Sequence, residues 1–193
     1  NNILRCIKTM NFSKLPSNLP IPQDDGGCDH LLSAKIPEIS LPNQDGNFLK
    51  INRSDIFRIV LYCYPMTGNP NKPLPENWDN IPGARGCTPQ TFSFIDKYDD
   101  LTKLNAIPIG LSSQSIEEIK EMTLRLNVPY DVLSDYDLKF TSLLKLPTFK
   151  IKEKIFIKRL TLIIESCVIK KVFYPIFPPD LHINDVIRWL EKN

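Results

Sequence analysis

An unbroken apolar run in the first third of the chain is the feature that most constrains its fold. Residues 57–64 read Phe-Arg-Ile-Val-Leu-Tyr-Cys-Tyr, a series of β-branched, aromatic and apolar side chains with one arginine. A strand with one solvated face alternates apolar and polar residues, whereas a strand buried on both faces is apolar throughout. We therefore expect residues 57–64 to form a central strand, with helices covering both sides of its sheet.

Helix signals recur along the rest of the chain. Thr88 is a candidate N-cap with Pro89 at the first helical position, followed by an apolar helical stripe that ends at Leu101. Ser115 forms a capping box with Glu118, which predicts a helix over residues 116–126. Two further helices are expected over residues 135–144 and after Pro178-Pro179-Asp180, the last with Val186, Ile187 and Leu190 facing inward.

Short alternating or β-branched segments predict the remaining strands. Residues 36–41 and 48–51 flank a turn and indicate an edge hairpin. Further strands are expected at residues 106–111 and 132–133, and an antiparallel meander at residues 148–151, 155–165 and 167–174. Alternating strands and helices predict parallel pairing in the first half, to which the meander adds antiparallel strands. The expected class is α/β, with a mixed central sheet flanked by helices in the element order of a thioredoxin-like fold.

Composition favours an ordinary single-domain protein. Of 193 residues, 42% are apolar and 24% are charged, which suits one sizeable core. Lys and Arg total 24 against 22 acidic residues, a net charge of +2, so we expect no nucleic-acid partner. No stretch approaches the roughly 18 apolar residues of a membrane span, so we expect no membrane partner. Residues 1–35 are polar and rich in proline, which indicates an irregular N-terminal arm ahead of a domain over residues 36–193.

Five scattered cysteines favour a reducing compartment. Their number is odd, no Cys-x-x-Cys pair occurs and the chain has only two histidines, so we expect neither a disulfide framework nor a metal site. This cysteine usage predicts a cytoplasmic protein. Because the sequence begins with Asn1 rather than Met, a targeting signal further upstream stays open.

Cys87 is the cysteine in the most reactive setting. It follows a long loop rich in Pro, Asn and Gly over residues 65–86, at the expected start of a helix. The free N–H groups and the positive dipole end of a helix N-terminus stabilise an anion, so a thiol there is shifted toward the nucleophilic thiolate. Arg85 adds positive charge, and Gly83 and Gly86 let backbone amides approach a small ligand. The alternative is a buried structural cysteine near a helix start.

Sequence blocks around Cys87 resemble the peroxiredoxins. The resemblance rests on Tyr62-Cys63-Tyr64-Pro65, Ile81-Pro82-Gly83-Ala84-Arg85-Gly86-Cys87-Thr88-Pro89-Gln90, Leu146-Pro147-Thr148-Phe149 and Lys158-Arg159-Leu160-Thr161-Leu162, in this order. It runs from about Leu15 to the C-terminus. The branch that the chain resembles is the bacterioferritin-comigratory (peroxiredoxin Q) group, with a long insertion before the active cysteine.

The resemblance implies a thiol peroxidase that needs no metal, flavin or haem cofactor. Cys87 takes the place of the peroxidatic cysteine, which attacks the terminal oxygen of a peroxide and becomes a sulfenic acid. Arg159, in the strand expected over residues 155–165, takes the place of the arginine that holds the thiolate and polarises the peroxide. Gly86 and Arg85 are expected at the substrate, and Tyr64 either lines the pocket or packs in the core. The implied partners are hydrogen peroxide or a small organic hydroperoxide and a thiol reductant (thioredoxin, glutaredoxin or glutathione), with the chain a monomer or a homodimer.

Two departures from the family pattern bear on the chemistry. The pattern Pro-x-x-x-Thr-x-x-Cys places a hydroxyl residue three positions before the cysteine, where this chain has Ala84. Pro65 and Thr67, at the upstream end of the insertion, either supply the shielding proline and the hydroxyl or are plain turn residues. The resolving cysteine of the resembled branch often lies five positions after the peroxidatic one, where this chain has Phe92.

The four remaining cysteines are the candidates for a substitute resolving thiol. We expect none of them to act, so that an external thiol reduces the sulfenic acid. Cys28 ranks next, because it lies on the irregular arm and a mobile arm could approach the site. Cys63 is expected to be inert core, Cys167 to be exposed at a hairpin tip, and Cys6 lies in a tail that the pattern does not place.

Two rival functions are weighed against the peroxidase. A thiol–disulfide oxidoreductase needs Cys-x-x-Cys, and Gln90 stands at the second position. A non-catalytic redox sensor or interaction protein on a peroxiredoxin scaffold stays open, because the usual Thr and resolving Cys are missing. Among other conspicuous residues, His30 and His182 lack metal-ligand spacing and are expected to be structural or at the surface. Trp78 is expected either to cover the mouth of the site or to anchor the long loop.

Overall fold

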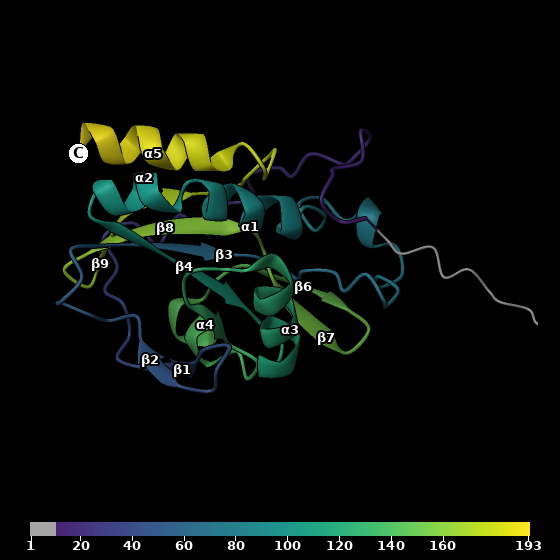
Figure 1. Ribbon diagram of the computed structural model, residues 1–193, viewed down its shortest axis with the longest axis horizontal. Coiled ribbons are helices and arrows are strands. Elements are labelled where there is room, and N and C mark those ends of the chain that lie inside the picture. Colours follow the sequence, from purple (N-terminus) through teal and green to yellow (C-terminus); the bar gives the residue numbers. More distant parts are fainter. Residues whose placement is uncertain (1–10) are drawn as a thin grey trace, which may run out of the picture.

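The computed structural model describes residues 11–193 and centres on a five-stranded sheet (Figure 1). The strands of this sheet are Arg58–Cys63 (β3), Ala106–Ser112 (β4), Val132–Ser134 (β5), Leu160–Glu165 (β8) and Val168–Phe173 (β9). Their spatial order is β5-β4-β3-β8-β9. β3 pairs in parallel with β4, and β4 with β5, whereas β8 is antiparallel to both β3 and β9. This mixed sheet confirms the expected α/β class.

Strand β3 is buried on both faces of the sheet, as its apolar run predicts. Every one of its residues is buried. Ile59 and Leu61 belong to the hydrophobic core on one face, and Val60 and Tyr62 to the core on the other. Side chains alternate between the two faces of a strand, so one continuous apolar strand supports both cores.

Helices cover both faces of the sheet. The helices are Cys87–Asp96 (α1), Tyr98–Lys103 (α2), Ile116–Leu126 (α3), Lys139–Leu144 (α4) and His182–Lys192 (α5), with a short 3-10 helix at Trp78–Asn80. Figure 1 shows α1, α2 and α5 along one face of the sheet. α3 contributes Ile119 and Met122 to the same core, and α4 contributes Phe140 and Leu144 to the opposite one. No helix within residues 11–193 combines the length and the apolar composition needed to cross a membrane.

The expected meander is wrong in one respect that matters for the site. The segment 155–165 is not one strand, because it divides around Lys158 and Arg159 into β7 (Lys154–Ile157) and β8. Within residues 11–193, β7 pairs only with β6 (Thr148–Ile151), in a separate two-stranded sheet. β8 returns to the central sheet with Leu160 opposite Cys63. Arg159 therefore lies just before its strand, beside the end of β3.

Several predicted helix boundaries are also shifted. α1 begins at Cys87 rather than after Thr88, and its N-cap is Gly86 in the left-handed region (φ 109°). The helical stripe is broken after Asp96, so α1 and α2 are separate helices. α4 begins at Lys139 rather than at Asp135, whose carboxylate instead accepts hydrogen bonds from the N–H groups of the first turn. The capping box of Ser115 and Glu118 is confirmed.

The edge hairpin predicted at residues 36–41 and 48–51 is present with slightly different bounds. It pairs β1 (Ser40–Pro42) with β2 (Phe48–Lys50) as a two-stranded sheet. In Figure 1 it lies on the side of the central sheet opposite α5. Leu41 of β1 and Ile51, just after β2, are buried in the core beneath it.

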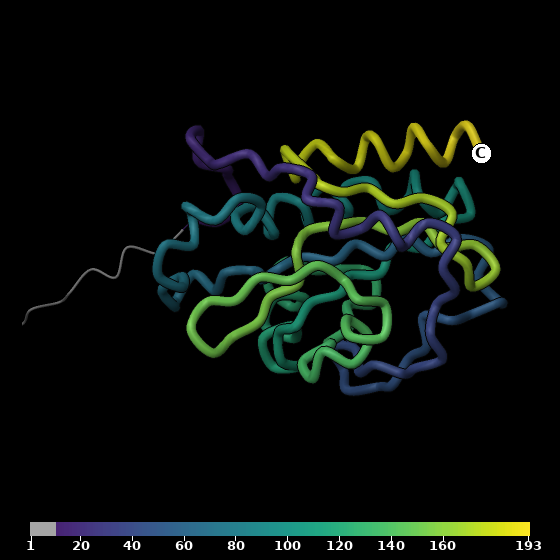
Figure 2. The backbone as a smooth tube through the Cα atoms, turned by 180° about the vertical axis from the view of Figure 1, so that it is seen from behind, coloured from purple at the N-terminus to yellow at the C-terminus, as the bar shows by residue number. Residues whose placement is uncertain are grey.

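The N-terminal arm has little regular structure, yet it packs on the body of the protein. Figure 2 shows the purple segment running across the back of the molecule. Leu31 is fully buried in the core. The N–H of Ser33 donates to the carbonyl of Ile169 at 2.9 Å, so the end of the arm is held against strand β9. The domain boundary at residue 35 stays a prediction. It falls within a segment that packs against the body of the protein.

Candidate active site

Cys87 is the first residue of α1 and lies beside the end of strand β3. Its side chain is 3% exposed and belongs to the same core as Tyr62 and Phe94. The Sγ atom is 3.1 Å from Nη2 of Arg159, which donates to it, and 3.6 Å from the carbonyl oxygen of Ala84. The sulfur therefore lies at a helix N-terminus beside a guanidinium, in an electropositive setting. The structure thus brings together two residues that the resemblance linked.

The guanidinium of Arg159 is fixed by a dense set of acceptors. The side chain is 3% exposed. Its Nη1 donates to Oε1 of Gln90, and its Nη2 donates to the carbonyls of Gly83, Ala84 and Arg85, each at 3.2 Å. Because these acceptors lie on α1 and the loop that precedes it, one cation holds the loop, the helix and the sulfur together. A preorganised cation of this kind stabilises negative charge that develops during a reaction.

Gly86 has a packing and conformational role at the start of α1. Its φ of 109° lies in a region that side chains other than glycine rarely adopt. A Cβ atom there would lie 2.5 Å from Cγ of Pro179 and 2.8 Å from Cδ2 of Leu15. The glycine therefore lets the N-terminal arm and the segment before α5 close directly over the turn that carries Cys87.

The Arg85 side chain does not join Cys87, contrary to expectation. Its Nη1 lies 2.8 Å from a carboxylate oxygen of Asp79, and its guanidinium stacks over the ring of Phe12 at 5.1 Å. Its carbonyl alone takes part in the site, as one of the acceptors of Arg159. These contacts support a role in holding the loop rather than in binding substrate.

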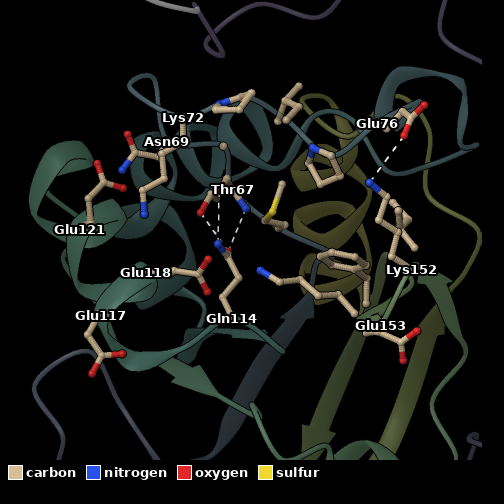
Figure 3. Close-up of a pocket in the computed structure, with 18 residues that line it drawn as sticks. Thr67, Asn69, Lys72, Glu76, Gln114, Glu117, Glu118, Glu121, Lys152 and Glu153 are labelled. Atoms are coloured by element: carbon tan, nitrogen blue, oxygen red, sulfur yellow. Dashed lines mark hydrogen bonds and ion pairs between the residues drawn. The ribbon is translucent and has the colours of Figure 1, made fainter.

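Thr67 is likewise engaged elsewhere. Its hydroxyl donates to Oε1 of Gln114 at 3.1 Å and its backbone N–H donates to the same atom at 2.9 Å. Figure 3 shows this pair in a cavity of about 640 Å³ between the long loop, α3 and the β6–β7 hairpin, and Cys87 is not among its lining residues. The contacts of Thr67 therefore do not support it as the hydroxyl that replaces the one missing at Ala84. No local sequence signal pointed to Gln114, which lies 47 positions away.

Pro65 and Tyr64 follow directly on strand β3 and are buried. Tyr64 is fully buried in the core that also contains Cys87. Of its two expected roles, the structure therefore supports packing in the core. Burial raises the pKa of its hydroxyl well above the ordinary value. Pro65 is buried as well, and its role as a shield for the thiolate stays a prediction.

Gln90 is the site residue that sequence reasoning missed. The sequence gives Gln90 no role beyond ending the block that resembles the peroxiredoxins and ruling out Cys-x-x-Cys, yet its side chain is fully buried and accepts from Arg159. Residues three positions apart lie on the same side of a helix, so its spacing from Cys87 was the available signal. Thr88 and Thr91 also bury hydroxyls that have no hydrogen-bond partner among the described residues.

The expectation that Cys28 is mobile is wrong. Cys28 is 6% exposed and packs in the core on the opposite face of the sheet from Cys87. Burial raises the pKa of its thiol to about 12, with a further contribution from the nearby Asp25 carboxylate. Such a thiol is almost entirely protonated at neutral pH and is a poor partner for a sulfenic acid.

The remaining cysteines give no resolving pair within the described residues. All four cysteines in residues 11–193 are free thiols. Cys63 is fully buried in β3, as expected for inert core, and burial raises its pKa well above the ordinary value. Cys167 is half-buried rather than exposed, and its thiol donates to Oδ1 of Asn52 at 3.2 Å. Cys6 lies outside the described residues.

The two histidines and Trp78 have structural contacts. Nε2 of His182 is 2.9 Å from the Thr161 hydroxyl, and burial, together with the charge of Arg159, lowers the pKa of this imidazole to about 3. Nε2 of His30 is 2.8 Å from the carbonyl of Leu144. Trp78 is 3% exposed and packs against Phe156, so it anchors the long loop rather than covering a mouth. Within residues 11–193 no group of three His, Cys, Asp or Glu side chains is arranged to hold a metal ion.

Comparisons with known proteins show the family of the chain. The Redoxin family model matches residues 32–187. The chain is 26% identical to a putative peroxiredoxin bcp of Coxiella burnetii over 53% of its own length and 58% of the relative's. It is 25% identical to the chloroplastic peroxiredoxin Q of Suaeda salsa over 81% of its own length and 65% of the relative's. The chain thus spans less than two thirds of these two relatives.

Solved structures share the fold at low sequence identity. The peroxidoxin BcpB of Mycobacterium tuberculosis superimposes with a TM-score of 0.70 at 19% identity, covering 84% of this chain and 98% of that one. Peroxiredoxin Q of Xanthomonas campestris gives a TM-score of 0.63 at 16% identity, covering 91% and 96%. The thioredoxin-like fold that we expected is therefore confirmed. The chain belongs to the redoxin family, and within it to the peroxiredoxins of the bacterioferritin-comigratory (peroxiredoxin Q) branch.

Proposed function

We propose that this protein is a thiol peroxidase that reduces hydrogen peroxide or a small organic hydroperoxide through Cys87. The observation that carries the proposal is the 3.1 Å contact between Nη2 of Arg159 and the Cys87 sulfur at the start of α1. The contact joins a nucleophile to a fixed cation. A peroxide needs both, because its O–O bond breaks heterolytically and the leaving oxygen becomes negative.

The chemical step can be written with these two residues. The Cys87 thiolate attacks the terminal oxygen of the peroxide, forming an S–O bond while the O–O bond breaks. The bonding electrons leave with the second oxygen, which takes up a proton and departs as water or an alcohol. Sulfur is oxidised to sulfenic acid and the peroxide is reduced. Arg159 offers N–H donors to the developing negative charge on the leaving oxygen.

An external thiol completes the cycle in this proposal. Phe92 occupies the position of the usual resolving cysteine, and Cys28 and Cys63 are buried in the core on the other face. A reductant thiol therefore attacks the Cys87 sulfenic acid, which releases water and forms a mixed disulfide. A second thiol then attacks this disulfide and restores the Cys87 thiol. Thioredoxin, glutaredoxin and glutathione are the reductants to compare.

Turnover of the Cys87→Ser variant tests the proposal. Consumption of hydrogen peroxide is followed with dithiothreitol as reductant, for the wild type, Cys87→Ser and the control Cys167→Ser. The proposal expects sustained turnover in the wild type and the control, and none in Cys87→Ser. If the wild type is oxidised once and does not turn over, the protein is a redox sensor and the peroxidase proposal is wrong.

A further inference from the structure

The cavity of about 640 Å³ at Thr67 lies apart from the candidate active site, because neither Cys87 nor Arg159 lines it. Three elements enclose it: the first half of the long loop before α1, the start of α3 with Gln114 just ahead of it, and the β6–β7 hairpin (Figure 3). Pockets of this size bind small ligands by combining an apolar surface with a few polar groups. The peroxidase step uses none of the lining residues, so these groups are free to serve another ligand.

The loop and the hairpin contribute an apolar patch to this cavity. Met66 and Leu74 line it from the loop, and Ile151 and Phe156 line it from the hairpin. Phe156 is buried, whereas the other three are half-buried and pack against the small core cluster that contains it. Half-buried apolar side chains keep surface that a ligand can still cover, and covering this surface is favourable. We therefore expect the ligand to carry an apolar group.

The wall formed by α3 carries negative charge that no side chain neutralises. Glu117, Glu118 and Glu121 line the cavity from this helix, and Figure 3 shows them together on one side. Glu121 is paired with Arg125, whose Nε lies 2.6 Å from its carboxylate. Neither Glu117 nor Glu118 forms an ion pair within residues 11–193. A positive group of the ligand therefore finds two available carboxylates at this wall.

The hairpin across the cavity presents the opposite charge. Lys152 is paired with Glu76 of the loop at 3.7 Å, and Glu153 is paired with Lys150 at the same distance. Lys154 also lines the cavity, and it forms no ion pair with any residue that the structure describes. The hairpin wall thus keeps one ammonium group for a negative group of the ligand.

The charges without an ion pair select a zwitterion. Lys72 of the loop lines the cavity too and, like Lys154, forms no ion pair among the described residues. A ligand with charge of one sign would be attracted by the two carboxylates and repelled by the two ammonium groups, or the reverse. A ligand with one charge of each sign is attracted by both sets.

Gln114 adds a neutral hydrogen-bond donor to the cavity. Its side chain is 6% exposed, and its Nε2 donates to the carbonyl of Thr67 at 3.3 Å. A side-chain amide has two N–H donors, so one N–H is left for an oxygen of the ligand. The cavity therefore combines an apolar patch, a neutral donor and charged groups of both signs.

We propose that this cavity binds a short apolar peptide with free ends, its ammonium group toward the glutamates of α3 and its carboxylate toward Lys154. A peptide carbonyl accepts from Gln114, and an apolar side chain covers the patch. In a free amino acid the two charges sit on one carbon, whereas in an extended tripeptide they lie roughly 10 Å apart. Walls of opposite sign on two different elements therefore favour a peptide over a single amino acid. This site does not depend on the peroxidase function.

Three forms of one tripeptide test the proposal by isothermal titration calorimetry on the full-length, reduced protein. The probes are Ala-Leu-Ala with free ends, its N-acetylated form and its C-terminal amide, so that each cap removes one charge and leaves the apolar side chain. We expect saturable binding of the free tripeptide and a dissociation constant about three to five times higher with either cap. Absence of saturable binding at millimolar concentrations, or equal affinity of all three probes, would overturn the proposal.

Variants at both walls identify the partner of each charge. In Lys154→Gln the amide and the free acid should bind equally, because the partner of the carboxylate is gone. In Glu117→Gln the acetyl cap should weaken binding less than in the wild type, since Glu118 still supplies a carboxylate. The control is Lys120→Gln, an exposed residue of α3 that does not line the cavity, and it should keep both wild-type differences. If the amide is as much weaker in Lys154→Gln as in the wild type, or if the control loses the differences too, the proposal is wrong.

Discussion

Nη2 of Arg159 lies 3.1 Å from Sγ of Cys87, although the two residues are 72 positions apart in the chain. The break between β7 and β8 brings them together, because it leaves Arg159 at the end of the sheet where β3 leads toward the cysteine loop. Replacing Arg159 by lysine keeps the positive charge but removes the fork that binds Gln90 and three carbonyls.

The Arg159→Lys variant should therefore lose most of its activity. We expect kcat/KM for hydrogen peroxide to fall by about 10²-fold or more, because one ammonium group cannot hold the loop and the leaving oxygen together. Stopped-flow oxidation gives the rate, and Arg188→Lys on the exposed face of α5 is the control. Wild-type kcat/KM in Arg159→Lys would show that a charge alone suffices.

Gly86→Ala should be more destabilising than a matched glycine substitution elsewhere. Gly46 also has a positive φ, of 81°, but a Cβ atom there meets nothing within 4 Å, whereas at Gly86 it meets Pro179 and Leu15. Backbone strain alone should lower the free energy of unfolding of Gly46→Ala by about 1 kcal/mol. Strain and overpacking together should cost Gly86→Ala about 2–4 kcal/mol. Urea unfolding measures the loss of stability in both variants. Equal losses would show that Pro179 and Leu15 move away from a Cβ atom at position 86 without cost.

His182 should make the stability of the protein depend on pH. Its pKa is about 3 in the folded protein, against an ordinary value of 6.5, because the ring is buried and lies near Arg159. As pH falls below 6.5, the unfolded chain binds a proton that the folded protein binds only near pH 3, so the free energy of unfolding decreases. Between pH 7 and 5 this loss amounts to about 2 kcal/mol.

Comparison with His182→Gln isolates the histidine contribution. Both proteins are unfolded with urea at pH 7 and pH 5, and the change in the free energy of unfolding is compared. The variant should lose about 2 kcal/mol less than the wild type over this range. Identical losses would mean that His182 is protonated as easily in the folded protein as in the unfolded chain.

Cys28 should be chemically silent in the folded protein. Burial raises the pKa of its thiol to about 12, which leaves almost no thiolate at neutral pH. We expect Cys28→Ser to keep wild-type turnover with peroxide and dithiothreitol, and the wild-type Cys28 to escape alkylation by iodoacetamide unless urea is added. Peptide mapping identifies the modified cysteines. Rapid labelling of Cys28 in the native protein, or loss of turnover in Cys28→Ser, would instead support Cys28 as the resolving cysteine for the Cys87 sulfenic acid.

Features set by local sequence were predicted well. The apolar run of β3 depends only on its own residues, and so does the capping box of Ser115. The position of Cys87 at a helix start followed from the same local signals, although the cap proved to be Gly86 rather than Thr88. The capping role of Gly86 was not predicted, because a left-handed cap without a side-chain hydrogen bond leaves no donor or acceptor pattern in the sequence.

Features that depend on contacts between residues far apart in the chain could not be predicted from local sequence. No periodicity shows that Thr67 would meet Gln114, or that the arm around Cys28 would pack into the core. The pairing of Arg159 with Cys87 came from the family resemblance, since spacing alone cannot join residues so far apart. The break at Lys158 and Arg159 was hidden because apolar residues flank it on both sides.

The most direct test of the account is the mass of the protein after one equivalent of hydrogen peroxide in the absence of thiols. The account predicts that the wild type gains one oxygen, that this oxygen maps to the peptide carrying Cys87, and that Cys87→Ser gains none. An oxygen on another cysteine with Cys87 unmodified would contradict it.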